Sequence, residues 1–232
     1  ALYAHIRILW RLERGAVPKL PPSDILSDFS LRFSDSQNIA ATATAGPPLI
    51  HSSLVEISQS LHYGGGGQQA PWMLMVDQAM LEYYQVCISH FGLPCWCPDL
   101  RDTAYSPYNS ACRIIALTTF QQGILAKVYD QLLPNPRYVT NTMLILKLYD
   151  HFVHYYQQKR FTKEKKSPGS VTISEELKTV YKNRERLAAC RKKFAKEMKL
   201  PAQYINMVSE VKATSDDEWD PELGAYAIKR RP

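Results

Sequence analysis

The chain has 232 residues, of which 45% are hydrophobic and 22% charged, the balance of an ordinary globular protein. This length is enough for one large domain, or for one domain with an appendage. No stretch approaches the ~18 consecutive apolar residues of a membrane span, and no secretory or transit signal is found, so we expect no membrane partner. The five cysteines form an odd set without regular spacing, which favours a reducing compartment, nuclear or cytoplasmic.

Positive charge is concentrated in one segment. Residues 159–199 contain 14 of the 28 Lys and Arg residues and only five Glu, a local balance of +9. Residues 1–158 balance to −1 and residues 200–232 to −2, so the formal charge of +6 describes a basic segment joined to a near-neutral body. The chain starts without Met, inside a predicted helix, and we expect it to be part of a longer protein.

Before the basic segment, apolar residues recur at helical spacing and Pro or Gly residues separate the helices they predict. The predicted helices cover 2–14, 23–33, 49–61, 72–91, 110–133 and 137–160. Residues 35–48 are expected to form a linker and residues 92–109 an irregular loop. Two-residue alternation is almost absent, so no strand pair is predicted. The expected fold is all-α: an irregular multi-helix bundle over 1–160, with a C-terminal basic helix and a charged tail.

The C-terminal part is predicted to begin with a solvated linker over 161–173. A basic amphipathic arm follows over 174–213, with Ser174 as the N-cap of its main helix and Pro201 as the end of that helix. A second short helix is expected near 202–212. The tail, 214–232, is acidic and then basic, and is expected to be extended.

The main helix of the arm carries a dense cationic surface. Its members are Lys178, Lys182, Arg186, Lys192, Lys193 and Lys196. Lys and Arg side chains on one surface neutralise phosphates and release counterions, which gives salt-dependent nucleic-acid binding. No spacing identifies a helix-turn-helix, homeodomain or zinc-finger reader. The favoured function is therefore a non-catalytic module of a larger protein, associated with DNA, RNA or chromatin.

The same helix also carries an apolar stripe, which supports a second hypothesis. The stripe consists of Leu177, Val180, Leu187, Phe194 and Met198, and Arg184 and Arg191 interrupt it seven residues apart. A purely electrostatic tail needs no such stripe. The alternative function is an interaction scaffold whose arm docks on a protein partner or on a second copy.

Four soft ligands lie within eleven residues: Cys87, His90, Cys95 and Cys97. Their number and type suit a structural zinc, which takes four N or S ligands, and the pair His151 and His154 offers additional ligands. The Cys-x-Cys spacing is less usual than Cys-x-x-Cys, and no second pair follows. The other interpretation, that these cysteines are small buried hydrophobic residues, is favoured, so no cofactor is expected. A redox pair is disfavoured because no strand precedes Cys95.

No catalytic motif is found. The run Gly64–Gly67 lacks the Lys-Ser/Thr of a phosphate loop, and Asp77 and Glu82 are five residues apart and do not share a helix face. An enzyme whose catalytic residues lie elsewhere is the least favoured class. Tyr155, Tyr156 and Phe161 directly precede the basic segment, where aromatic rings either pack in the core or stack on unpaired bases.

Overall fold

The computed structural model describes residues 1–13, 15–33, 39, 41–42, 47–63, 72–213, 217–220 and 225–228. The chain divides into two compact units, Ala1–Pro168 and Gly169–Pro232. Both are mostly helical, which confirms the predicted all-α class, and each contains a short antiparallel strand pair.

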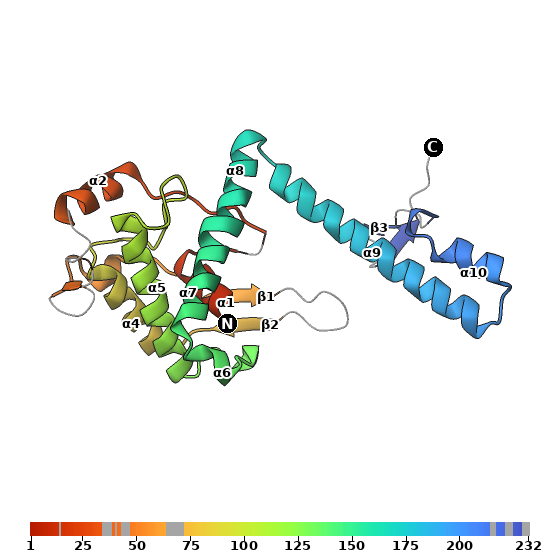
Figure 1. Ribbon diagram of the computed structural model, residues 1–232, viewed down its shortest axis with the longest axis horizontal. Helices are drawn as coiled ribbons and strands as arrows, with labels where there is room; N and C mark the ends of the chain where they lie inside the picture. Colours follow the sequence, from red (N-terminus) through yellow and green to blue (C-terminus); the bar gives the residue numbers. More distant parts are fainter. Residues whose placement is uncertain are drawn as a thin grey trace. The chain divides into compact units, whose positions relative to one another are not determined.

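Unit 1 is built around helix α1, Leu2–Leu9, which contacts α5, Pro107–Leu125, and α7, Thr142–Asp150 (Figure 1). Six of the eight α1 residues are buried, because the helix is apolar on most sides and must be covered on most sides. The helix ends earlier than the predicted 2–14, and Arg11 follows with a left-handed φ of 52°.

The neighbouring helices start at side-chain caps or a Pro. Helix α2, Ser23–Arg32, follows Pro22 and buries Phe29 edge-on against Tyr108 of α5, in agreement with the helix predicted over 23–33. Helix α4, Gln78–Ser89, starts at Asp77, whose carboxylate accepts the Met80 N–H at 3.0 Å. Helix α5 starts at Ser106, followed by Pro107 in the first helical position.

Around the glycine run one predicted helix is wrong and another begins later than predicted. Where a helix was predicted over 49–61, the chain forms a 3-10 turn, η1 (Ser52–Leu54), and strand β1 (Ser60–Tyr63). Strand β2, Trp72–Met75, replaces the first part of the helix predicted over 72–91 and pairs antiparallel with β1. The physical reason is burial on one face: Leu61 and Leu74 are opposite each other and buried, whereas Met73 and Met75 are largely exposed. Gly64–Gly67 lie outside the described residues.

A long continuous helix closes unit 1. The short helix α6, Pro136–Val139, leads to α7, which continues through a π-helical segment, η3 (His151–Gln157), into α8, Gln158–Lys166. Two side chains of α8 attach it to the body: Gln158 donates to the carbonyl of Leu100 at 2.9 Å, and Arg160 to that of Gly15 at 2.6 Å. Residues up to Lys166 are thus helical, although they fall partly in the predicted linker 161–173.

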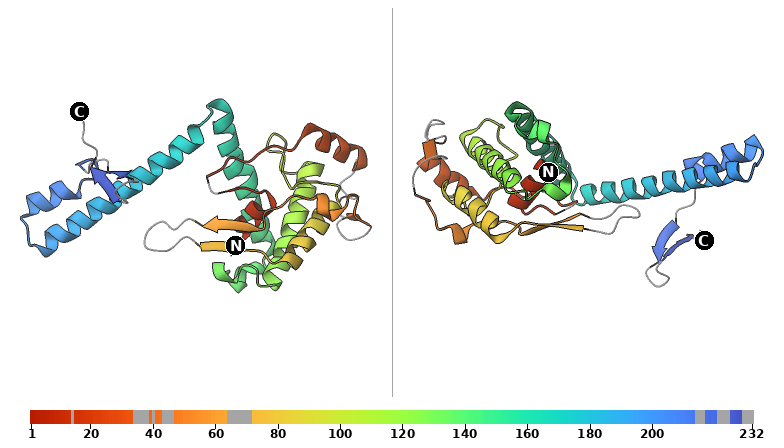
Figure 2. Two further views of the ribbon diagram at one scale, coloured as in Figure 1. Left: turned by 180° about the vertical axis from the view of Figure 1, so that it is seen from behind. Right: turned by 90° about the horizontal axis from the view of Figure 1, so that it is seen from below.

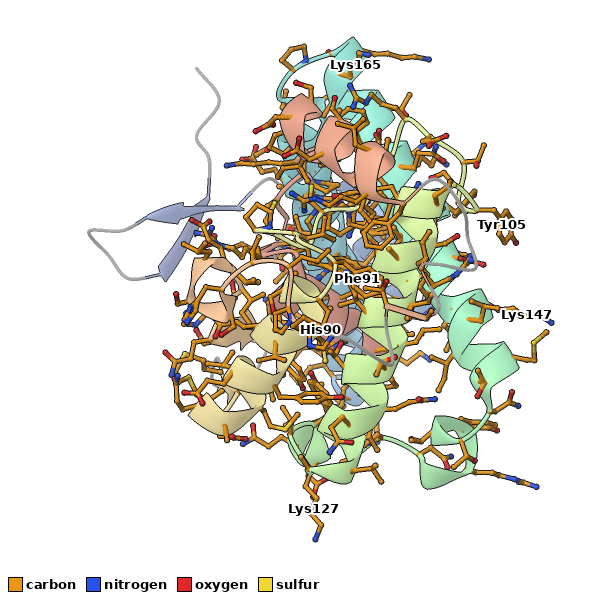
Figure 3. All side chains as sticks on the ribbon, turned by 90° about the vertical axis from the view of Figure 1, so that its left-hand side faces the viewer. His90, Phe91, Tyr105, Lys127, Lys147 and Lys165 are labelled. Carbon is orange, nitrogen blue, oxygen red and sulfur yellow. The ribbon has the colours of Figure 1, made fainter. Side chains whose placement is uncertain are left out.

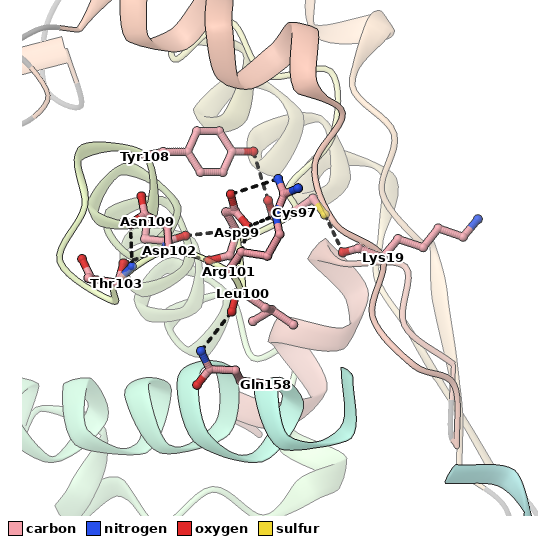
Figure 4. Close-up of polar contacts among 10 residues, drawn as sticks. All are labelled: Lys19, Cys97, Asp99, Leu100, Arg101, Asp102, Thr103, Tyr108, Asn109 and Gln158. Carbon is pink, nitrogen blue, oxygen red and sulfur yellow. Dashed lines mark hydrogen bonds and ion pairs between the residues drawn. The ribbon is translucent and has the colours of Figure 1, made fainter. Parts of the chain in front are cut away.

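The loop between α4 and α5 is held by a polar network (Figure 4). The buried amide of Asn109 accepts the Asp99 N–H at 2.9 Å and donates to the carbonyls of Asp99 and Thr103 at 3.0 and 2.8 Å. Tyr108 donates to the carbonyl of Cys97 at 3.0 Å. This irregular backbone is therefore satisfied by side chains instead of by a sheet or helix ladder.

Unit 2 is dominated by helix α9, Ser170–Glu197, with α10, Ala202–Ser209, folded back along it (Figure 2). Helix α9 starts after Gly169, its N-cap, which has a left-handed φ of 81°, and so begins four residues before the predicted Ser174. The predicted cap role of Ser174 is wrong: its hydroxyl donates to the Ser170 carbonyl at 2.7 Å, inside the helix.

Small residues allow the two helices of unit 2 to approach closely. Ala188 and Ala195, seven residues apart, are 3% and 2% exposed on the side of α9 that α10 and the 3-10 turn η4 (Val211–Ala213) contact. The tail contains an antiparallel pair, β3 (Asp217–Asp220) with β4 (Ala225–Ile228), where an extended segment was predicted. The remaining tail residues lie outside the described part.

Candidate nucleic-acid interface

All six predicted phosphate-binding residues lie on α9, and all six side chains are exposed. At 100° per residue, five of them (Lys178, Lys182, Arg186, Lys193 and Lys196) fall within an arc of about 80°, and Lys192 lies about 40° outside it. From Lys178 to Lys196 this surface extends for about 27 Å along the helix. We call these six residues the basic face.

The acidic residues near the basic face only partly neutralise it. Glu175, Glu185 and Glu197 share this side of the helix, so six cations and three carboxylates leave a balance of +3. Lys178 pairs with Glu175 at 3.1 Å, and Lys193 with Glu197 at 3.9 Å. Exposed pairs of this kind contribute little and are easily exchanged for a phosphate partner.

The apolar stripe lies on the opposite side of α9, roughly 170° from the centre of the basic face. Leu177, Phe194 and Met198 are 63%, 61% and 59% exposed, Val180 is also exposed, and Leu187 is half-buried. The early start of α9 adds Ile173, which is 56% exposed and which the sequence analysis missed. The Pro168-Gly169 break was the sequence signal that places Ile173 inside the helix.

A second surface combines rings with cations on η3 and α8 of unit 1. Tyr155, 59% exposed, stacks on His151 and has the Lys159 ammonium 6.0 Å from its ring centre. Tyr156 stacks on Phe152 and lies 5.7 Å from the Arg160 guanidinium. Phe161, in contrast, packs against the hydrophobic core and is not placed for base stacking. The accessible aromatic candidates are therefore Tyr155 and Tyr156.

The proposed zinc ligands are not brought together. Within the described ranges, no three His, Cys, Asp or Glu side chains gather where they can hold a metal ion. Cys97 is buried and its thiol donates to the carbonyl of Lys19 at 2.9 Å, while Cys95 is half-buried beside Glu56. His90 forms the C-cap of α4, and Cys87 is half-buried within that helix.

The electrostatics of the cysteines also disfavour thiolate chemistry. Burial raises the pKa of Cys97 to about 12, and burial raises the pKa values of Cys87, Cys95 and Cys112 as well. These thiols stay protonated at neutral pH, and a metal-binding or redox cysteine needs the thiolate.

The remaining polar candidates have structural roles. Asp77 caps α4, and Glu82 accepts a hydrogen bond from Gln78 one turn before it. His5 is completely buried, with its two ring nitrogens 2.6 Å from the Tyr129 hydroxyl and 2.8 Å from the Thr119 hydroxyl. Burial lowers the pKa of His5 to about 3, so the ring is neutral at physiological pH.

Comparison with known proteins adds one match. The model of a domain family of unknown function, DUF8263, matches residues 162–232, which begin in α8 and include all of unit 2. No curated protein and no solved structure matches the chain. Among the helices that the structure describes, none is both long and apolar enough to cross a membrane.

Proposed function

We propose that the protein is a non-catalytic, nucleic-acid-associated module of a larger nuclear or cytoplasmic protein, and that the basic face of α9 binds the phosphate backbone. The observation that carries the proposal is the alignment of the six exposed cations on one side of a single helix. Scattered surface lysines produce no such local potential, whereas a line of cations about 27 Å long follows a charged backbone.

The residue types favour binding to the backbone over reading of bases. The six residues are five Lys and one Arg, and Lys acts as a point charge without the bidentate fork that recognises guanine. We therefore propose sequence-independent binding. Tyr155 and Tyr156 of unit 1 are the residues that would stack on bases if the ligand is single-stranded.

The experiment compares two triple charge reversals in the full chain. K192E/K193E/K196E alters the basic face, and K127E/R137E/K147E makes the same change in net charge at exposed positions of unit 1. Two of the control residues, Lys127 and Lys147, point away from the body of unit 1 (Figure 3). Binding of labelled duplex DNA and single-stranded RNA is measured by fluorescence anisotropy.

We expect the basic-face variant to lose most of its affinity and the control to lose little. Equal losses in the two variants would mean that only net charge matters, and an unchanged basic-face variant would refute the proposal. A variant with Tyr155→Ala and Tyr156→Ala distinguishes single-stranded from duplex ligands. It should weaken binding of single-stranded RNA and leave binding of duplex DNA unchanged.

A second candidate function is supported by a different observation. Four of the five residues of the apolar stripe remain exposed after α10 has folded onto α9, which is typical of a helix that docks on a partner. The interaction scaffold is therefore kept as the alternative function. Its docking surface would be the apolar stripe, which lies opposite the basic face and would not be covered by bound phosphates.

A further inference from the structure

One side of α9, exposed except at the half-buried Arg184 and Leu187, has the spacing of a coiled-coil helix. Its members alternate at intervals of four and three residues: Ile173, Leu177, Val180, Arg184, Leu187, Arg191, Phe194 and Met198. This is a heptad pattern in which Leu177, Arg184, Arg191 and Met198 take the a positions and the others the d positions. We call these eight residues the seam, which extends for about 38 Å along the helix.

The seam is shaped to receive side chains from outside. Its N-terminal half exposes Ile173, Leu177 and Val180, and α10 folds onto the other end of the helix. At that end a largely apolar pocket of ≈ 390 Å³ opens beside the seam. The pocket is lined by Cys190, Arg191, Phe194, Ala195, Leu200 and Val208. A helical partner can thus pack knobs along one half and insert a side chain beside Arg191 in the other.

Charge disfavours a second copy as the occupant. In a parallel pair of identical helices the a positions face each other, so Arg184 and Arg191 would each lie against the same residue of the copy. In the antiparallel pairing that aligns the two seams end to end, Glu176 of one helix lies beside Glu197 of the other. The outer positions add no compensation, because each copy carries the same basic face.

We propose that the seam binds an amphipathic helix of another protein, one with two acidic residues seven apart within its own apolar heptads. The carboxylates lie opposite Arg184 and Arg191, and apolar side chains cover Leu177, Val180, Leu187 and Phe194. Charged residues in the seam fix register and partner choice at some cost in stability. This inference gives the alternative scaffold function a partner class and rests on that function, not on nucleic-acid binding.

The two surfaces of α9 are compatible with each other. All six residues of the basic face occupy b, c and f positions of the heptad, which point away from a helix seated on the seam. The protein therefore joins an acidic helix on one side to a polyanion on the other, and the acidic helix does not compete for the phosphate-binding lysines.

The test uses a pair of synthetic helical peptides of about four heptads with Leu in the core positions. One peptide carries Glu at two core positions seven apart, and its twin carries Lys there. We expect the full chain to bind the Glu peptide at least ~10-fold more tightly than the Lys peptide in isothermal titration calorimetry. R184E/R191E should reverse this preference, a gain of binding that a misfolded variant cannot give.

The matched variants locate the site. L177D/V180D should weaken binding of the Glu peptide at least ~10-fold, whereas T179D/A189D, the same change on the exposed outer side, should not; circular dichroism checks that both retain their helices. The variant K192E/K193E/K196E should lose nucleic acid and keep its preference for the Glu peptide. Equal affinity for the two peptides would overturn the proposal. So would sedimentation showing a dimer of the chain that L177D/V180D dissociates.

Discussion

The buried imidazole of His5 makes the stability of unit 1 depend on pH. Thr119 donates its hydroxyl to the Ile115 carbonyl at 2.6 Å, so it accepts from Nε2–H of His5, and Nδ1 accepts from the Tyr129 hydroxyl. The folded state thus holds the neutral ring. Burial lowers its pKa from 6.5 to about 3, and the unfolded chain protonates His5 at the ordinary value.

The sign and size of the effect follow from this difference. Below pH 6.5 the unfolded state binds a proton that the folded state does not, so the free energy of unfolding falls by about 1.4 kcal/mol per pH unit. Between pH 7 and pH 5 the loss is about 2 kcal/mol, and it continues as the pH approaches about 3. The range from pH 7 to pH 5 is the better one for the measurement, because carboxylates with ordinary pKa values remain ionised there.

The assay compares the wild-type chain with His5→Gln by urea unfolding at pH 7, 6 and 5. The Gln amide retains one donor and one acceptor but does not titrate. We expect the wild-type free energy of unfolding to fall by about 2 kcal/mol more than that of the variant across this range. Burial also lowers the pKa of His154, but that contribution is common to both proteins and cancels. Parallel pH profiles would refute the assignment of His5 as a buried neutral base.

Two further predictions concern unit 1 and the cysteines. Asn109→Ala should lower the free energy of unfolding by about 2–4 kcal/mol in the same assay, because the N–H of Asp99 and the carbonyls of Asp99 and Thr103 lose their partner; a change under about 0.5 kcal/mol would contradict the network. A thiol reagent on the native protein should modify the exposed Cys190 first and the buried Cys112 only on unfolding, as read by mass spectrometry of peptides; early modification of Cys112 would contradict its placement.

The helical class and the basic helix could be predicted because both are local properties. Lys182, Arg186 and Lys193 fall on one face through the period of the helix alone, whatever the rest of the molecule does. The opposite stripe follows from the same period. The first residue of α9 was harder to predict. Ser174 is a residue type that commonly caps helices, and only the left-handed φ of Gly169 shows that α9 begins earlier.

The strand pair of unit 1 could not be predicted by periodicity. The segment Trp72–Val76 consists entirely of apolar residues, and such a run does not distinguish a strand from a buried helix. The alternation becomes visible only when Leu74 and Val76 are seen to be buried and Met73 and Met75 exposed. The pairing partner, β1, lies across a glycine-rich connection, and that signal was interpreted as a helix end.

The cysteine and histidine cluster shows the limit of spacing arguments. Four possible ligands, three Cys and one His, lie within eleven residues and made a zinc site a possible interpretation, although burial of the cysteines as small hydrophobic residues was favoured. In the structure Trp96, between Cys95 and Cys97, is buried and donates to the carbonyl of Cys112 at 2.8 Å. The segment is thus held by core packing.

The basic face is tested most directly by a salt titration of nucleic-acid binding with the full chain. If all six residues contact phosphates, the logarithm of the association constant for duplex DNA should fall with a slope of about −5 against the logarithm of the salt concentration. With this slope, the association constant falls about 1000-fold between 50 and 200 mM salt. K192E/K193E/K196E should flatten the slope by about 3, and the K127E/R137E/K147E control should retain it. A salt-independent affinity, or a slope unchanged in the basic-face variant, would contradict the account.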